Sequence, residues 1–268
     1  QQYGIAHEDE AIQNVKTTED VRRLIASQAP VSNALKMQGG EVHVYPRWPW
    51  WAVVQGVRAV FLELIAMPLV RLLAKPRVAG GRLPTKGPIL IVANHVTSYD
   101  VPLALYALPR RLRIRVAVAM SGEMILDWRK GRNQGHAFLD LLAPLEYWVV
   151  TALFNVFPLP QLSGFRRSFQ HAGEAVDRGY SVLIFPEGRR ADDENLQPFK
   201  SGTGLLWKEL GIPAVTVRLH GLGELKRRQV SWFRSKLIRV SVGEPMVLDR
   251  SKSPEQLTEM LRRAIETQ

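Results

Sequence analysis

The residues best placed to do chemistry are His95 and Asp100, which lie five positions apart directly after the apolar run 89–93. A free imidazole titrates near pH ~6.5, so His95 can take a proton from a hydroxyl group at neutral pH. A carboxylate on the other ring nitrogen would fix the tautomer and stabilise the imidazolium that forms. In the alternative interpretation, Asp100 only caps the following helix and His95 is a surface histidine. The pair is therefore a candidate general base with its orienting group.

A second polar cluster follows another apolar run, 182–185, and contains Glu187, Gly188, Arg189 and Arg190. A carboxylate and a glycine directly after a buried strand place a polar side chain and exposed backbone N–H groups beside a site. Arginine side chains can grip a phosphate through paired hydrogen bonds. The alternative for this cluster, which we do not prefer, is a turn that carries solvated charges.

Strands and helices alternate along the chain and position both clusters. Apolar runs predict strands at 89–93, 114–119, 182–185, 214–219 and 237–242. Helices are predicted over 165–178 and 200–210, which stop at Gly179 and Gly211, and after Ser253, which begins a capping box. This order predicts an α/β fold with a largely parallel central sheet flanked by helices. Because sites in such folds lie at the carboxyl ends of strands, we expect the two clusters to form one site.

Composition limits the classes of partner and chemistry. The chain has 268 residues, a formal net charge of +11 and no cysteine. The charge favours phosphate-bearing partners, and nucleic acid is disfavoured because no helix-turn-helix, zinc-finger or RNA-binding signature occurs. The lack of cysteine excludes disulfides, thiolate catalysis and cysteine metal sites. Because no Gly-x-Ser-x-Gly motif is present either, a covalent intermediate is disfavoured and direct attack by a substrate hydroxyl is favoured.

Two apolar stretches, 48–73 and 137–162, indicate contact with a membrane. Pro68 is expected to split the first stretch into a helical pair, whose tryptophans favour a bilayer interface. Charged residues interrupt both stretches, so neither offers the ~18–20 uncharged residues of a clean spanning helix. We therefore expect peripheral or shallow insertion, on the cytoplasmic side of a membrane. A helix packed on the protein's own core is the alternative for each stretch.

The combination of motifs resembles the glycerolipid acyltransferases, which comprise glycerol-3-phosphate and 1-acylglycerol-3-phosphate acyltransferases. The motifs are, in order, Asn94-His95-x4-Asp100, Phe185-Pro186-Glu187-Gly188 and Pro198-Phe199-Lys200-x-Gly202. The likeness covers roughly residues 50–248. It implies transfer of a fatty acyl group from a thioester of acyl carrier protein or CoA to a hydroxyl of a glycerol phosphate or lysophospholipid, in phospholipid biosynthesis or remodelling. It implies no cofactor beyond this acyl co-substrate.

The resemblance also implies roles for individual residues. His95 would be the general base, and Asp100 would orient it. The residues implied in binding the acceptor are Glu187, Gly188, Arg190 and Lys200.

The chain departs from the family pattern in three ways, of which one, Thr216 in place of a usual second proline, is expected to have little effect on the chemistry. Gln161 stands where the family usually has an arginine, and Arg166 or Arg167 is the expected replacement for binding the acceptor's phosphate. The separation between the two polar clusters is also larger than usual. The extra length includes the apolar segment 137–154, which we interpret as a membrane-touching or acyl-channel insertion.

The first 28 residues are similar to the end of an acyl carrier protein. Glu8-Asp9-Glu10 is an acidic stretch, and Thr17-Thr18-Glu19-Asp20-Val21 follows it. We expect 1–28 to be the remnant of a carrier domain, 29–47 a linker, 48–75 the membrane-associating helical pair and 76–268 the catalytic domain. Basic residues at 110–115 and 226–228 are expected to dock an acidic carrier or an anionic lipid, unless they form an ordinary solvated face.

Two other function classes fit part of the same residues. A metal-dependent hydrolase would use His95, Asp100, Glu187 and Asp192 as ligands, although we expect no metal. A non-catalytic lipid- or carrier-binding module is the other class, and Gln161 favours it. The acyltransferase is preferred because His95 and Asp100 are both intact.

Overall fold

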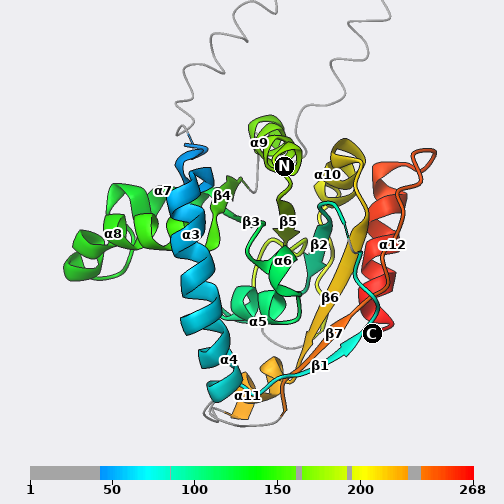
Figure 1. Cartoon of the computed structure of the whole chain (residues 1–268), viewed down its shortest axis with the longest axis horizontal. Coiled ribbons are helices and arrows are strands. Elements are labelled where there is room, and N and C mark those ends of the chain that lie inside the picture. Colours follow the sequence, from blue (N-terminus) through cyan, green and yellow to red (C-terminus); the bar gives the residue numbers. More distant parts are fainter. Residues whose placement is uncertain (1–42, 85, 161–164, 192–194, 229–236) are drawn as a thin grey trace, which may run out of the picture. The chain divides into compact units, whose positions relative to one another are not determined.

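The computed structural model describes residues 43–84, 86–160, 165–191, 195–228 and 237–268 (Figure 1). The carrier-like segment 1–28 and most of the expected linker 29–47 therefore lie outside the described residues. The unit from Val44 to Gln268 is built around one sheet, which determines where the candidate site residues lie.

Within the described residues, seven strands form this sheet in the order β1-β7-β6-β2-β5-β3-β4. The strands are β1 (Arg77–Gly80), β2 (Leu90–Ala93), β3 (Val116–Ser121), β4 (Val156–Leu159), β5 (Ser181–Ile184), β6 (Ala214–His220) and β7 (Arg239–Val242). The run from β6 through β2, β5 and β3 to β4 is parallel, whereas β7 is antiparallel to β6 and parallel to β1. The predicted α/β fold with a largely parallel sheet is confirmed.

The strands β1 and β4 are absent from the sequence-based prediction, and both lie at edges of the sheet. All four residues of β1 are exposed, so no apolar run marks it in the sequence. β4 contains Pro158, which hides the strand because proline lacks the N–H that a sheet needs. A proline is tolerated there because β4 pairs only with β3 among the described strands.

The helices after the sheet begins are α5 (Asp100–Tyr106), α6 (Arg110–Arg113), α7 (Gly122–Lys130), α8 (Ala137–Phe154), α9 (Phe165–Asp177), α10 (Gly202–Leu210), α11 (Leu222–Arg228) and α12 (Pro254–Glu266). The predicted C-terminal end of α10 and the predicted start of α12 are confirmed. Gly211 has a left-handed φ of 64° directly after α10. Ser253 and Gln256 form the predicted capping box at the start of α12.

The central strand β2 is apolar at every position because both faces of the sheet are covered. Ile89 and Ile91 belong to a core that includes Leu103 of α5. Leu90 and Val92 belong to a second core, which α9, α10 and α12 contribute to on the other face. Packing on both faces fixes the direction in which the carboxyl end of β2 points.

The apolar stretch before the sheet forms one continuous helical run rather than the expected helical pair. It consists of α3 (Ala52–Phe61), the π-helical turn η2 (Leu62–Ala66) and α4 (Met67–Leu73), and a short 3-10 turn, η1 (Trp48–Trp50), precedes it with the extended residue Trp51 between them. In a regular α-helix, the ring of Pro68 would clash with the carbonyl of Leu64, four residues earlier. Here the N–H of Met67 instead bonds to the carbonyl of Leu62, five residues earlier. The wider π turn accommodates the proline, so Pro68 does not split the helix.

One face of this helical run packs on the core, and the other is exposed. Leu62, Ala66 and Met67 are buried in the first core. The exposed large apolar side chains are Val53, Val57, Val60, Leu64, Ile65, Leu69 and Leu72 on this run and Phe138, Leu139, Leu141, Leu142, Leu145, Trp148 and Val149 on α8. We call these residues together the apolar helical surface. The alternative of helices buried in the protein's own core is therefore wrong for most of their apolar residues.

Arg58 joins the two parts of the apolar helical surface. Its side chain is only 1% exposed, and it donates from Nε to the carbonyl of Ala152 at 2.9 Å and from Nη2 to the carbonyl of Pro49 at 2.7 Å. α3 and α8 therefore contact each other, and α8 runs across the direction of α3 (Figure 1). By length and composition, both Ala52–Leu73 and Ala137–Phe154 are able to cross a membrane.

Candidate active site

The two polar clusters meet at the carboxyl ends of β2 and β5, which are neighbouring parallel strands. His95 lies two residues after β2, and Glu187 lies three residues after β5. The backbone N–H of His95 donates to Oε1 of Glu187 at 3.0 Å. The structure thus brings together residues that are 92 positions apart in the sequence.

His95 and Asp100 form a hydrogen-bonded pair, with 2.7 Å between Nδ1 and Oδ2. The same oxygen accepts from the backbone N–H groups of Val96 at 2.6 Å and Thr97 at 2.9 Å. The Thr97 hydroxyl donates to Oδ1 at 2.7 Å. Asp100 is fully buried and is the first residue of α5, whose N-cap is Tyr99. Asp100 therefore holds the His95 loop and is not the helix cap that the alternative interpretation required.

The His95 ring is held so that its second nitrogen is available. Asp100 binds Nδ1, and the ring stacks on Phe185 with 4.5 Å between the ring centroids. The side chain is 23% exposed, so the ring is not sealed inside the protein. An imidazole with Nδ1–H bound to a carboxylate carries its free lone pair on Nε2, where it can accept a proton.

Asn94 fixes the chain just before His95, a role that sequence reasoning missed. Its side-chain amide donates to the carbonyl of Leu219 at 3.1 Å and accepts from the N–H of Leu219 at 2.7 Å. These bonds continue the pairing of β2 with β6 beyond the last register pair, Ala93 with Val217. An asparagine directly after an apolar run is the sequence signal from which this role of Asn94 could have been predicted.

Glu187 is almost buried, with 5% exposure. Its second oxygen, Oε2, accepts from the backbone N–H of Gln197 at 3.1 Å. Burial raises the pKa of Glu187, and the hydrogen bonds from His95 and Gln197 oppose this shift. Both oxygens of the carboxylate are therefore engaged by main-chain donors.

Gly188 and Lys200 lie against each other beside this carboxylate. Gly188 has a left-handed φ of +69°, and a Cβ at this position would lie 2.5 Å from Cε and 2.9 Å from Nζ of Lys200. A side chain here would be strained and would displace the lysine. Glycine at position 188 thus allows the Lys200 ammonium group to lie over the loop.

Arg190 connects the two loops of the site. Its Nη1 donates to the hydroxyl of Ser98, between His95 and Asp100, at 3.1 Å. Arg189 reaches the Gln197 side chain at 3.4 Å. Arg189, Arg190 and Lys200 are exposed, so the loops around His95 present cations to solvent.

Other predicted residues are placed differently. Arg166 and Arg167 are exposed in the first turn of α9, and no contact with the His95 loop is seen for them among the described residues. Gln161 and Asp192 lie outside the described residues. The side chain of Arg113 is mostly buried, and its Nε lies 3.6 Å from Oε1 of Glu63. The carboxylate of Glu63 therefore offsets part of the positive charge expected at 110–115.

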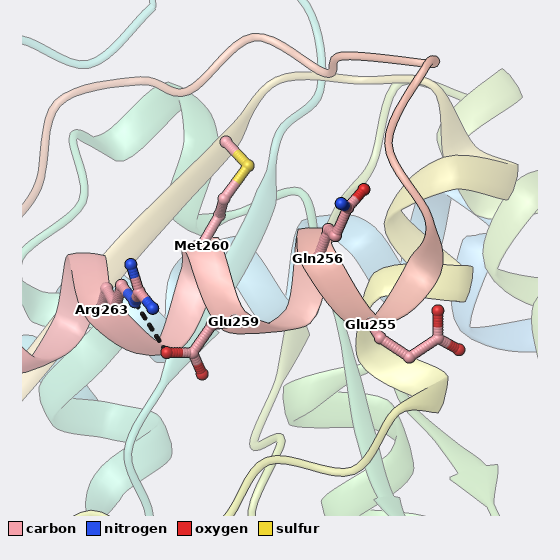
Figure 2. Close-up of a pocket in the computed structure, with 5 residues that line it drawn as sticks. All are labelled: Glu255, Gln256, Glu259, Met260 and Arg263. Atoms are coloured by element: carbon pink, nitrogen blue, oxygen red, sulfur yellow. Dashed lines mark hydrogen bonds and ion pairs between the residues drawn. The ribbon is translucent and has the colours of Figure 1, made fainter.

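The donor set around the carboxylates does not favour the hydrolase alternative. Oxygens of Asp100 and Glu187 accept from N–H and O–H groups, which a metal ion would have to displace. In the ranges that the structure describes, no group of three or more His, Asp or Glu residues is placed to hold a metal ion. A hollow on α12 is lined by Glu255, Gln256, Glu259, Met260 and Arg263, and it includes none of the candidate site residues (Figure 2).

Comparison with known proteins identifies the family. The family model described as acyltransferase matches residues 75–220, and the chain belongs to this acyltransferase family. The resemblance to the glycerolipid acyltransferases is therefore confirmed. The match includes both polar clusters and the strands β1 to β6.

Two similar proteins are 1-acylglycerol-3-phosphate acyltransferases. The chloroplastic 1-acyl-sn-glycerol-3-phosphate acyltransferase BAT2 of Brassica napus is 42% identical over 99 residues, which are 35% of this chain and 28% of that protein. The aligned part is thus less than a third of the relative's length. The crystal structure of the 1-acyl-sn-glycerophosphate acyltransferase PlsC from Thermotoga maritima superposes with a TM-score of 0.48 and 18% identity over 80% of this chain and 79% of that one.

Proposed function

We propose that this protein transfers a fatty acyl group from a thioester to a hydroxyl of a glycerol phosphate or lysophospholipid, in phospholipid biosynthesis or remodelling. The observation that carries the proposal is the His95–Asp100 pair, at 2.7 Å, at the end of a central parallel strand. Membership of the acyltransferase family supports the reaction class. The similarity to the 1-acyl-sn-glycerol-3-phosphate acyltransferase of Brassica napus supports the acceptor class.

In the proposed mechanism, Nε2 of His95 takes the proton from the acceptor hydroxyl as its oxygen attacks the thioester carbonyl. A C–O bond forms, and a tetrahedral oxyanion results. When the carbonyl re-forms, the C–S bond breaks and the thiolate leaves with the electron pair, taking the proton from the imidazolium. Asp100 stabilises the imidazolium while it exists. These steps need only proton and acyl transfer, so the proposal includes no cofactor and no metal.

The acceptor's phosphate is proposed to bind the cations around His95. Arg190 and Lys200 are exposed on the loop that follows β5, and Arg190 already reaches Ser98. Guanidinium and ammonium groups are the usual protein partners of phosphate. Arg166 and Arg167 stay predictions for the same role, because α9 begins after residues that lie outside the described part of the chain.

The donor is proposed to be a thioester of acyl carrier protein or CoA. The net charge of +11 supports either one, since both are acidic. The carrier-like sequence of residues 1–28 favours a carrier-bound donor. A basic face that includes the exposed Arg110 and Arg111 is the proposed docking area.

We also propose that the apolar helical surface contacts the cytoplasmic side of a membrane. Soluble proteins rarely expose a contiguous apolar patch larger than a few hundred Å². Here α3 and α8 contact each other and expose the large apolar side chains of this surface, which include Trp148. Trp51, directly before α3, is exposed as well. Such a surface would bring the site to acceptors that are lipids, whether the helices lie in the interface or insert more deeply.

The experiment that tests the function crosses donors with acceptors. Palmitoyl-CoA and palmitoyl-carrier protein are each assayed with glycerol 3-phosphate and with lysophosphatidate, using the wild type, His95→Ala and the control His136→Ala. His136 is an exposed histidine before α8. We expect at least one pair to react, His95→Ala to lose turnover with an unchanged fold, and His136→Ala to react normally. Near-wild-type turnover by His95→Ala would refute the mechanism.

A further inference from the structure

We infer that Glu187 is a positioning residue that holds the main chain of the catalytic base, and not a ligand of the acceptor. The motif resemblance placed Glu187 among the acceptor-binding residues. The inference deepens the proposed function and rests on it, because positioning of His95 matters only where His95 acts as a base.

The first observation concerns the carboxylate oxygens. Oε1 accepts from the N–H of His95 at 3.0 Å, and Oε2 accepts from the N–H of Gln197 at 3.1 Å. With 5% exposure, the side chain has almost no contact with solvent. A glycerol hydroxyl therefore has little access to this carboxylate, whose main-chain bonds already hold it in place.

The second observation concerns His95 itself. Its N–H is bound by Glu187, and its carbonyl accepts from the N–H of Ala191 at 2.7 Å. Its ring stacks on Phe185. The loop that runs from Phe185 to Ala191 thus fixes both main-chain polar groups and one ring face of His95. Asp100 adds the bond to Nδ1. The position of Nε2 depends on all four contacts.

The third observation is the separation of charges in the loop. Arg190 and Lys200 are exposed, whereas Glu187, which precedes both of them in the loop, is directed inward to backbone donors. A carboxylate facing the same ligand would repel a phosphate. The inward direction of Glu187 leaves the outer side of the loop to the cations. The loop thus separates positioning from acceptor binding.

Substitution distinguishes the two roles. In Glu187→Gln, the amide oxygen can accept one N–H, but the amide nitrogen faces the other donor, so one of the two main-chain bonds is lost. A displacement of about 1 Å at a catalytic group can lower the rate about 100-fold. We therefore expect kcat to fall by roughly 100-fold while the KM for the acceptor changes by less than about 3-fold.

The experiment measures initial rates with the reactive donor and acceptor pair from the assay above, and also the hydrolysis of the thioester by water without acceptor. The variants are Glu187→Gln, Arg190→Ala and the control Glu209→Gln, an exposed carboxylate on α10. We expect Glu187→Gln to lower kcat and acceptor-independent hydrolysis by similar factors, because both need His95. Arg190→Ala should instead raise the acceptor KM, and Glu209→Gln should match the wild type.

A raised acceptor KM with unchanged thioester hydrolysis in Glu187→Gln would overturn the inference. A second readout is the backbone amide signal of His95 in protein labelled with ¹⁵N-histidine, which should shift in Glu187→Gln and not in Glu209→Gln; an unshifted signal would also overturn it. If Glu187→Gln does not fold, Glu187→Asp serves in both measurements, since its carboxylate is too short to reach both donors. Failure of the proposed function is seen separately, as full activity in His95→Ala.

Discussion

The strand-end site and the apolar helical surface follow opposite rules of construction. At the site, the polar groups of His95, Asp100 and Glu187 are matched one by one to donors and acceptors at 2.6–3.1 Å. On the helical surface, Leu64 and Leu141 are 71% and 76% exposed, and neighbouring large apolar side chains are exposed with them. One region is complete within the protein, whereas the other is unfavourable in water by itself.

Under the proposed function, this difference assigns a separate task to each region. A catalytic base needs a fixed geometry, and buried hydrogen bonds supply it. Contact with a lipid surface needs apolar area without a fixed partner, because lipid tails have no defined positions. Substitutions at the site should therefore change activity, and substitutions on the helices should change lipid binding. Neither kind of substitution should have much effect on the other property.

The largest effect is expected at Asp100. Asp100→Asn replaces an acceptor by an amide that cannot hold Nδ1–H and both loop N–H groups, so His95 adopts the wrong tautomer. By analogy with catalytic triads, kcat should fall about 10³- to 10⁴-fold. Steady-state kinetics at saturating acceptor measure it, with Asp177→Asn, an exposed residue at the end of α9, as control. A loss below about 10-fold would mean that the pair is not a working dyad.

The next effect concerns His171, which anchors the start of the helical run. This buried imidazole stacks on Trp50 with 4.7 Å between centroids, and burial lowers its pKa from 6.5 to about 4. Below pH 6.5 the unfolded chain binds a proton that the folded chain does not bind until about pH 4. The free energy of unfolding should thus be highest above pH 6.5 and fall by about 3 kcal/mol on acidification to pH 4.

Urea unfolding at pH 7, 6 and 5 measures this dependence. His171→Phe keeps an aromatic ring against Trp50 but cannot titrate, so its unfolding free energy should depend less on pH. The exposed His136→Ala is the control. An equally steep loss in His171→Phe would assign the pH dependence to other groups.

The apolar helical surface is tested by adding charge to it. Leu64→Glu and Leu141→Glu should each lower partitioning into phosphatidylcholine vesicles by about 10- to 100-fold, since burying a leucine contributes about 1.5–3 kcal/mol. Stability in detergent should change by less than about 0.5 kcal/mol, because both side chains are exposed. Val247→Glu is the matched control, since Val247 is 81% exposed outside these helices. Equal binding of all three variants would exclude a membrane role for this surface.

The smallest effect is expected at Arg58, which joins α3 to α8. Arg58→Met keeps most of the side-chain volume but leaves the carbonyls of Pro49 and Ala152 without their donor. The free energy of unfolding should fall by about 1–3 kcal/mol. Arg71→Met, an exposed change on α4, is the control. If Arg58→Met lowers kcat under conditions in which the variant is still folded, the two regions are not independent.

Sequence reasoning works where one physical rule dominates. The continuous apolar run of β2 predicts a strand buried on both faces, and the polar residues after it predict a site at its carboxyl end. Gly211 and the Ser253 capping box mark helix ends because backbone geometry restricts those positions. These features together make the fold predictable.

The rest depends on contacts that no residue pattern records. Glu187 binds main-chain N–H groups, which every residue except proline possesses, so no partner residue identifies its role. β1 and β4 are defined by pairing with neighbours and not by their own composition. Pro68 predicts a break, but the alternative of a local π turn depends on the packing that holds both halves of the helix in line.

Because of that π turn, the packing of the helix against the protein depends on the number of residues in the helix. The positions directed toward the protein recur every fourth residue, at Arg58, Leu62, Ala66, Val70 and Ala74. A regular helix repeats every ~3.6 residues, so the wider turn at 62–66 absorbs part of this offset. Inherited loss of one codon within 62–66 would rotate everything before it by about 100° and carry Arg58 away from the carbonyl of Ala152 on α8. Variation in this helix is therefore expected as substitutions, and rarely as single-residue insertions or deletions.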